Sequence, residues 1–301
     1  MGDLIPLFPL GSPLFPGVVL PLQVFEPRYR RLVADLVALP AGSDRRFFGV
    51  VAIRQGWEVE RVAPAEALYD VGTTALLRAV TPQPDGGFRI VTVGGDRFRL
   101  LDVHAGDDPP YLEAEVEWLA DEEAAEEAAG DTESLQVADP LAGADPAVEE
   151  VARSVARGSM QVLQRGVRDL FARYATEVAL LQGGVLDDDE EEEEEGLAAL
   201  GDAVQQAAAD LGLDGEDGPG LDPDTAALLR QVSGDARALS YLVASAALLT
   251  TEDRQALLAE SATRRRLATE SRLLRRELTL LRELHVVPVP LQQFAGPLSL
   301  N

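Results

Sequence analysis

Short runs of β-branched and aromatic residues recur in the first 119 residues, and turn-forming residues separate them. Gln55–Gly56 and Asp85–Gly87 fit hairpin turns between such runs. Glu26–Leu39 differs, because Pro27 suits a first helical turn and the apolar residues after it form one helical stripe. The pattern predicts a small β domain over residues 1–119 with one helix. The predicted strands are Phe47–Arg54, Trp57–Ala63, Val71–Val80, Phe88–Gly94, Phe98–His104 and Tyr111–Trp118.

Helical spacing replaces this pattern from residue 145 onward. Asp145 and Pro146 suit an N-cap and a first helical position, and a long helix is predicted to run through residues 150–182. More helices are predicted over residues 225–285, where leucines seven residues apart form a seam for helix packing. Residues 286–301 contain three prolines and are predicted to form an extended tail. The seam consists of Leu267, Leu274 and Leu281.

The net charge of −26 comes from two stretches that contain no basic residue. Residues 120–149 hold 10 acids and residues 183–224 hold 16, whereas the rest of the chain has no net charge. Charge repulsion and a lack of large apolar residues oppose compact packing there. We therefore predict an acidic linker that ends in a helix start, and a disordered acidic insertion. The predicted fold class is α+β, with an N-terminal β domain followed by an α-helical bundle with disordered acidic insertions.

Composition excludes several kinds of site. The chain has no cysteine and no lysine, which removes disulfides, zinc-thiolate sites, a cysteine nucleophile, a P-loop and a Ser-Lys dyad. The absence of cysteine also suits a reducing cytoplasm. The uncharged stretch Leu4–Phe25 has the length of a membrane span, but five prolines interrupt it and no positive segment precedes it. We expect a cytoplasmic protein that does not bind a membrane.

Four segments resemble, in order, the substrate-binding domain found at the N-terminus of Lon proteases. The opening LFPLGSPLFPGVVLPLQVFEPRYRRLV, residues 7–33, is similar to the start of that domain. Phe48–Arg54, Val71–Ala75 and Val93–Arg99 are similar to its later motifs. Residues 239–284 are similar to its helical part, more weakly. Four matches in the same order are more specific than any one of them.

The resemblance implies a PUA-like β-barrel followed by a helical bundle, and a role in recognising protein substrates. It does not imply proteolysis, because we expect a module without the ATPase and protease domains of full Lon. The expected function is that of a non-catalytic protein or peptide recognition module. Its expected partners are unfolded or exposed protein segments, together with a separate protease or chaperone to which such segments would be passed.

The start of the predicted helix offers a candidate binding surface. Apolar and arginine side chains there can accept an unfolded segment, with arginine and tyrosine as anchors and the preceding proline-rich turn as an adjacent wall. Exposed sheet edges could add strand pairing. In the alternative interpretation Phe25 and Leu32 are core residues and the arginines are solvated or paired, and Trp57 is interpreted as a core residue. The candidate peptide-binding residues are Phe15, Pro16, Gly17, Arg28, Tyr29 and Arg31.

No catalytic residue, metal site or cofactor site is predicted. His104 and His285 are the only histidines and lie far apart in the sequence. The acidic run Asp187–Glu195 lacks the ligand spacing of a calcium loop. RNA binding stays an alternative, because PUA-like barrels hold RNA elsewhere and Arg264–Arg266 begin a basic stripe. The zero net charge of the folded regions argues against it, since nucleic-acid affinity needs a basic footprint. An enzyme ranks last, because no spacing singles out a catalytic pair.

Overall fold

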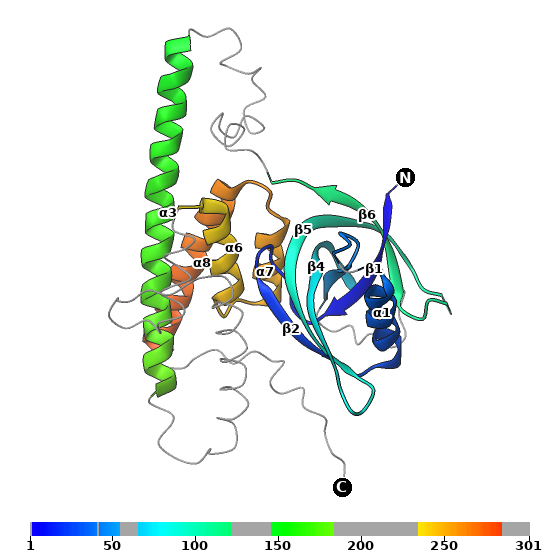
Figure 1. Ribbon diagram of the computed structural model, residues 1–301. Coiled ribbons are helices and arrows are strands. Elements are labelled where there is room, and N and C mark those ends of the chain that lie inside the picture. The colour runs from blue at the N-terminus through cyan, green and yellow to red at the C-terminus, as the bar shows by residue number, and fades with distance from the viewer. Residues whose placement is uncertain are drawn as a thin grey trace.

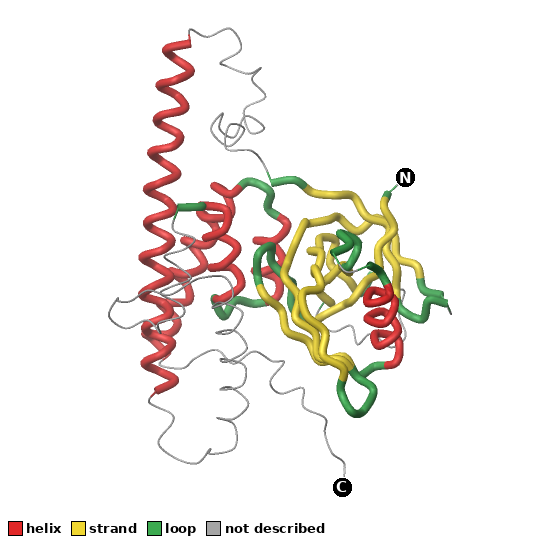
Figure 2. Tube along the Cα trace, in the orientation of Figure 1, coloured by secondary structure: helices red, strands yellow, loops and turns green. Residues whose placement is uncertain are grey.

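A computed structural model shows a curved mixed sheet with one helix packed on it, beside a separate group of helices (Figure 1). Figure 2 shows the strands gathered on one side with one helix, and the other helices on the opposite side. Among the helices that are described, none is long and apolar enough to cross a membrane. The structure describes residues 2–40, 42–54, 66–106, 108–121, 146–183 and 234–284.

The six strands form one sheet in the order β2-β5-β4-β3-β1-β6. Only β1 and β3 run parallel, and the other pairs are antiparallel. β5 pairs with β6 as well as with β4, so five strands form a ring of pairings, but β2 pairs with β5 alone. The predicted sheet-plus-helix class is confirmed, whereas the predicted barrel is not a clean one, because β2 stands outside the ring. The strands are β1 Asp3–Leu10, β2 Val19–Val24, β3 Phe47–Ile53, β4 Leu68–Pro82, β5 Phe88–His104 and β6 Leu112–Leu119.

The sequence pattern missed β1 and β2 because both contain proline, which cannot donate a ladder hydrogen bond. The pairing of β1 explains how it tolerates two prolines. Pro6 lies in the half that pairs with β6, and Pro9 lies in the half that pairs with β3. At each proline, therefore, one edge of the strand is unpaired, and the missing N–H can lie on that edge. β2 is an edge strand among the described strands, which is where proline is tolerated.

The two strands predicted over Phe88–Gly94 and Phe98–His104 are one continuous strand, β5. The glycines between them mark a close approach and not a turn. A Cβ atom at Gly94 would lie 2.0 Å from the backbone oxygen of Phe15. The strand predicted over Trp57–Ala63 lies outside the described residues.

Helix α1, Pro27–Ala38, covers one face of the sheet and is the single helix predicted in this region. Its buried side chains include Tyr29, Leu32 and Leu36. They pack in a core cluster with Phe48 and residues of other strands. A helical stripe therefore closes one side of the sheet core.

The other described helices are α3 Pro146–Gly183, α6 Ala236–Ala246, α7 Thr251–Ala259 and α8 Thr263–Leu284. The α3 helix begins at Pro146, the residue predicted for its first position. The leucines predicted as a seam on α8 are at most 1% exposed and pack in one cluster with Val167 and Phe171 of α3. The predicted acidic linker and acidic insertion fall almost entirely within residues 122–145 and 184–233, which lie outside the described residues, as does the predicted tail.

Candidate functional site

An apolar groove lies where β1 ends, β2 ends and α1 begins, with a volume of about 360 Å³. This volume falls near the lower end of the range for ligand pockets. One wall comes from Phe8–Gly11 and the other from Leu22–Glu26. The start of α1 and the end of β3 complete the groove. Its lining residues are Phe8, Pro9, Leu10, Gly11, Leu22, Gln23, Val24, Phe25, Glu26, Arg28, Tyr29 and Ile53.

Phe25 is 66% exposed, more than any other large apolar side chain among the described residues of the sheet region. It lies between β2 and α1, where the chain turns from strand to helix. Val24, directly before it, is 3% exposed. When a ligand covers an aromatic ring that was exposed to water, the burial of its apolar surface favours binding. Phe25 is therefore the strongest candidate anchor of the groove.

The Tyr29 ring contacts two neighbouring side chains, and Tyr29 is only 4% exposed. Its ring stacks on the Phe8 ring, with 3.9 Å between the two centroids. The Arg28 guanidinium carbon lies 4.7 Å from the centroid of the Tyr29 ring. Burial raises the pKa of the Tyr29 hydroxyl, and the Arg28 charge opposes that shift. Arg28 Nε donates to Glu26 Oε2 over 2.9 Å. The two groove charges thus neutralise each other, which favours an uncharged ligand.

The structure separates the predicted site residues into three places. Arg28 and Tyr29 line the groove, but Phe15, Pro16 and Gly17 do not. Phe15 is 1% exposed and packs against Tyr241 of α6, with 6.2 Å between the ring centroids. It therefore belongs to the boundary between the sheet and the helices and cannot offer a binding wall here.

Gly17 lies in the turn between Phe15 and β2, with φ of 77°, a conformation that favours glycine. Its N–H donates to the Gly94 oxygen over 2.8 Å. Pro16 is half-buried in the same turn. The close approach of this turn to β5 explains why the turn lies at the helices and away from the groove.

Arg31, the remaining predicted site residue, lies in a separate polar cluster. Its Nε donates to Asp35 over 2.9 Å, and its Nη2 lies 3.7 Å from Asp108. The Tyr111 hydroxyl donates to Asp35 over 3.1 Å. Burial, followed by this hydrogen bond, raises the pKa of Tyr111 to about 12. Arg31 has no part in the groove, and Trp57 lies outside the described residues.

Sequence reasoning missed most of the groove. Leu10, Leu22 and Ile53 come from three strands, and no local spacing predicts that they meet. Phe25 was named only in the alternative interpretation, as a core residue, and the structure shows the opposite. Along β2 exposed positions alternate with more buried ones, but VLPLQV is apolar at nearly every position, so the sequence gives no such alternation.

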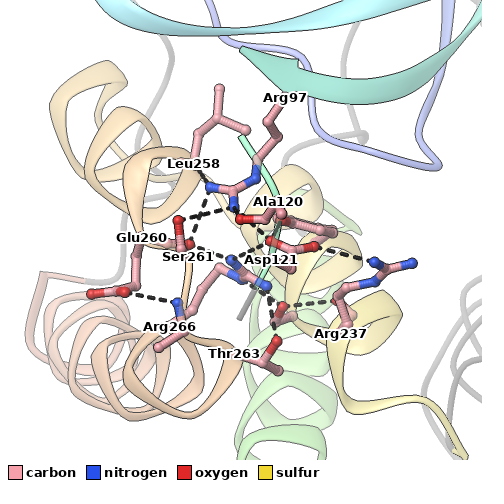
Figure 3. A network of polar contacts seen from close by, with 12 residues as sticks. Arg97, Ala120, Asp121, Arg237, Leu258, Glu260, Ser261, Thr263 and Arg266 are labelled. Carbon is pink, nitrogen blue, oxygen red and sulfur yellow. Dashed lines mark hydrogen bonds and ion pairs between the residues drawn. The ribbon is translucent and has the colours of Figure 1, made fainter. Parts of the chain in front are cut away.

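A second cluster of polar groups joins the sheet to the helices (Figure 3). The Arg97 side chain of β5 is 2% exposed and donates to the Leu258 oxygen over 2.8 Å and to the Ala120 oxygen over 3.1 Å. It also pairs with Asp121 over 2.7 Å. The Ser261 hydroxyl accepts from it over 3.2 Å. A single side chain of the sheet thus binds the turn that joins α7 to α8.

Asp121 is the carboxylate on which this cluster converges. Arg266 of α8 is fully buried and lies 3.8 Å from it, and Arg237 of α6 lies 3.4 Å from it. The Tyr241 hydroxyl donates to it over 2.7 Å. The Arg266 guanidinium also lies 4.0 Å from the Tyr241 ring centre. Buried charges need such partners, so the cluster fixes the sheet against the helices.

Glu270 lies one helical turn after Arg266 and is 1% exposed. Neither of its carboxylate oxygens has a hydrogen-bond partner. Burial raises the pKa of Glu270 well above its usual value, and the Arg266 charge opposes that shift. The Glu270 carboxyl therefore keeps its proton to a higher pH than an exposed glutamate does.

The described residues include no group of three or more His, Asp or Glu side chains that could hold a metal ion. His104 lies at the end of β5 with about half of its side chain exposed, 4.0 Å from Asp102. His285 lies outside the described residues.

Comparison with known proteins gives the family. Residues 4–276 match the family described as "ATP-dependent protease La (LON) substrate-binding domain". The match covers most of the chain, so the chain belongs to this family and the resemblance of the four segments is confirmed.

Relatives of known sequence are Lon proteases. Lon protease 2 of Syntrophobacter fumaroxidans is 41% identical over 105 residues, which are 35% of this chain and 12% of that protein. Lon protease 1 of Herpetosiphon aurantiacus is 24% identical over 282 residues, which are 93% of this chain and 25% of that protein. The chain therefore spans a quarter or less of the length of these two relatives.

Two solved structures are also similar. A Lon N-terminal domain protein from Xanthomonas campestris has a TM-score of 0.45 and 21% identity, covering 91% of this chain and 98% of that one. The N-terminal domain of a Mycobacterium avium complex Lon protease has a TM-score of 0.46 and 15% identity, covering 92% and 98%.

Proposed function

We propose that the chain is a non-catalytic protein-recognition module whose groove binds exposed apolar segments of other polypeptides. The observation that carries this function is the apolar groove with Phe25 left 66% exposed at its edge. Membership of a family described as a substrate-binding domain supports the same function.

The groove has the composition of a binding site for a side chain. Aromatic anchors that become fully covered dominate the affinity of many protein interfaces. Phe25 has most of its surface available for this, and Phe8 and Tyr29 form a rigid stacked pair beside it. A rigid wall loses little entropy when a ligand binds.

The partners that we propose are unfolded or exposed segments of proteins, which the module would pass to a separate protease or chaperone. The named relatives are Lon proteases, and the matched part is a small fraction of their length. A recognition role needs no catalytic group in this part of the chain. The PUA-like character of the sheet is part of the same proposal.

No specific observation favours RNA binding. The basic stripe that suggested it is divided in the structure, because Arg266 is buried and Arg276 pairs with Asp253 over 2.7 Å. Arg265 pairs with Glu260 over 3.1 Å. Paired arginines release fewer counterions on binding a phosphate backbone.

Fluorescence anisotropy tests the proposal, with a labelled unfolded polypeptide and a labelled single-stranded RNA titrated separately at low and moderate salt. We expect saturable polypeptide binding that survives added salt. Phe25→Ala should weaken it by about tenfold, equivalent to about 1.4 kcal/mol. Leu101→Ala is the matched control, because Leu101 is 52% exposed and lies outside the groove.

Two results would contradict the proposal. Absence of polypeptide binding would contradict the proposed function. Equal affinity in wild type and Phe25→Ala would contradict the assignment of the groove as the binding site. Salt-sensitive RNA binding without polypeptide binding would instead support the RNA alternative.

A further inference from the structure

The end of β2, Leu22–Val24, forms part of the groove wall, and the open edge of the same strand continues from there through Pro21, just outside the groove. β2 pairs with β5 in an unbroken register over Val19–Val24, and no other described strand pairs with it. Just before this ladder, the Gly94 N–H donates to the Val18 oxygen over 2.9 Å. Bonded pairs alternate along an antiparallel ladder. Every second residue of β2 after Val18 therefore has its backbone groups bonded to β5. The backbone groups of the residues between them point to the open edge.

Pro21 occupies the middle of that open edge. The residues whose backbone groups point to the open edge are Val19, Pro21 and Gln23. An added strand would need a backbone N–H from the middle one of these, and proline has none. Thr92 Oγ1 donates to the Leu20 oxygen over 3.0 Å, on the side of β2 that faces β5. Natural edge strands use proline to prevent pairing with other chains.

The opposite wall of the groove has the same feature. It consists of Phe8–Gly11, whose strand β1 pairs with β6 only up to Leu7. Pro9 lies in this stretch and has no N–H. Neither wall therefore offers the regular row of donors that strand addition requires.

Side-chain contacts remain as the means of recognition. The groove volume of about 360 Å³ has room for a few side chains and not for a long segment. Glu26 and Arg28 neutralise each other at its edge. The groove thus suits a bulky uncharged side chain that packs against Phe25.

We infer that the groove recognises a bulky apolar side chain without pairing with the backbone of its ligand, an inference that rests on the proposed function. The ligand class is polypeptide segments that present such a side chain in any backbone conformation. Segments that cannot form a strand, including proline-containing ones, belong to this class. Strand addition, in contrast, would reject them.

Backbone methylation separates the two modes. One short labelled peptide carries a single phenylalanine among alanine, serine and glycine. A second has the same sequence with N-methyl groups on the amides that flank the phenylalanine, and a third has serine in its place. Anisotropy with the full chain should give the first two peptides affinities within about twofold, and the serine peptide an affinity lower by about tenfold.

The outcomes distinguish this inference from the proposed function. A loss of about tenfold or more on methylation overturns the inference and leaves the function standing, because the backbone then contributes. No binding by any peptide overturns the function itself. Phe25→Ala should weaken the plain and methylated peptides equally, and Leu101→Ala should weaken neither. Methylated-peptide binding that ignores Phe25→Ala would also overturn the inference, since that peptide would bind elsewhere.

Discussion

The groove and the boundary between the sheet and the helices both pair arginine with a carboxylate, in opposite surroundings. At the groove, the side chains of Arg28 and Glu26 are 38% and 41% exposed. At the boundary, the side chains of Arg97 and Arg266 are 2% and 0% exposed and share Asp121. Exposed pairs contribute little to stability, whereas a buried charge that loses its partner is strongly destabilising.

The same contrast holds for two phenylalanines of one apolar run. Phe15 is covered by the helices and is 1% exposed, whereas Phe25 is 66% exposed beside the groove. We therefore expect stability to depend on the boundary and the proposed ligand binding to depend on the groove. Substitutions at each place should change one property and leave the other.

Asp121→Ala should have the largest effect on stability. It leaves Arg97 and Arg266 buried without their shared carboxylate, and we expect a loss of about 4 kcal/mol in the free energy of unfolding. Urea unfolding followed by circular dichroism measures it. Asp70→Ala is the matched control, because Asp70 is 79% exposed and pairs only at the surface with Arg54. Equal losses in the two variants would mean that burial of the pair does not matter.

Glu270→Gln should have a smaller effect, which depends on pH. Burial raises the pKa of Glu270 in the folded state, so between the unfolded and the folded pKa the folded chain holds a proton that the unfolded chain releases. Stability from this group is therefore present below the unfolded pKa and is lost as the pH rises through the folded pKa. The glutamine variant lacks this loss and should be the more stable protein at neutral pH.

Urea unfolding at several pH values checks this expectation. The difference between wild type and Glu270→Gln should grow with pH and then level off. Glu117→Gln serves as the control, because Glu117 is 53% exposed and pairs with Arg99 at the surface. A difference that does not vary with pH would show that Glu270 is ionised in the folded protein.

Glu26→Gln should have the smallest effect on stability, below about 1 kcal/mol, because its pair with Arg28 is exposed. It frees the guanidinium beside the groove. A peptide with aspartate next to its phenylalanine should then bind about twofold to fivefold more tightly, equivalent to up to about 1 kcal/mol. A neutral peptide should bind as before. A stability loss of several kcal/mol would instead make this pair part of the fold.

Much of the fold followed from local pattern. The strand near Phe47, helix α1, the start of α3 at Pro146 and the leucine seam of α8 all rest on short-range spacing. The strands with proline were missed, since their tolerance depends on which side of each strand is paired. The glycines inside β5 were interpreted as a break for a similar reason, because their role depends on the turn at Phe15.

The candidate site was less accessible to such reasoning. Arg28 and Tyr29 were found because their residue types are typical anchors beside an apolar run. Their placement in the groove depends on β1 and β3, which are distant in sequence. Arg31 has the same residue type as Arg28, but it pairs with Asp35 away from the groove. Residue type alone does not distinguish these two arginines.

The sequence by itself determined the family, the order of the main elements and the concentration of negative charge in two stretches. Only the tertiary structure decided that Phe15 is buried and Phe25 exposed, and that Arg97 and Arg266 meet at Asp121. The physical reason is that spacing fixes local conformation through nearby residues. Burial and charge pairing depend instead on distant segments that fold together.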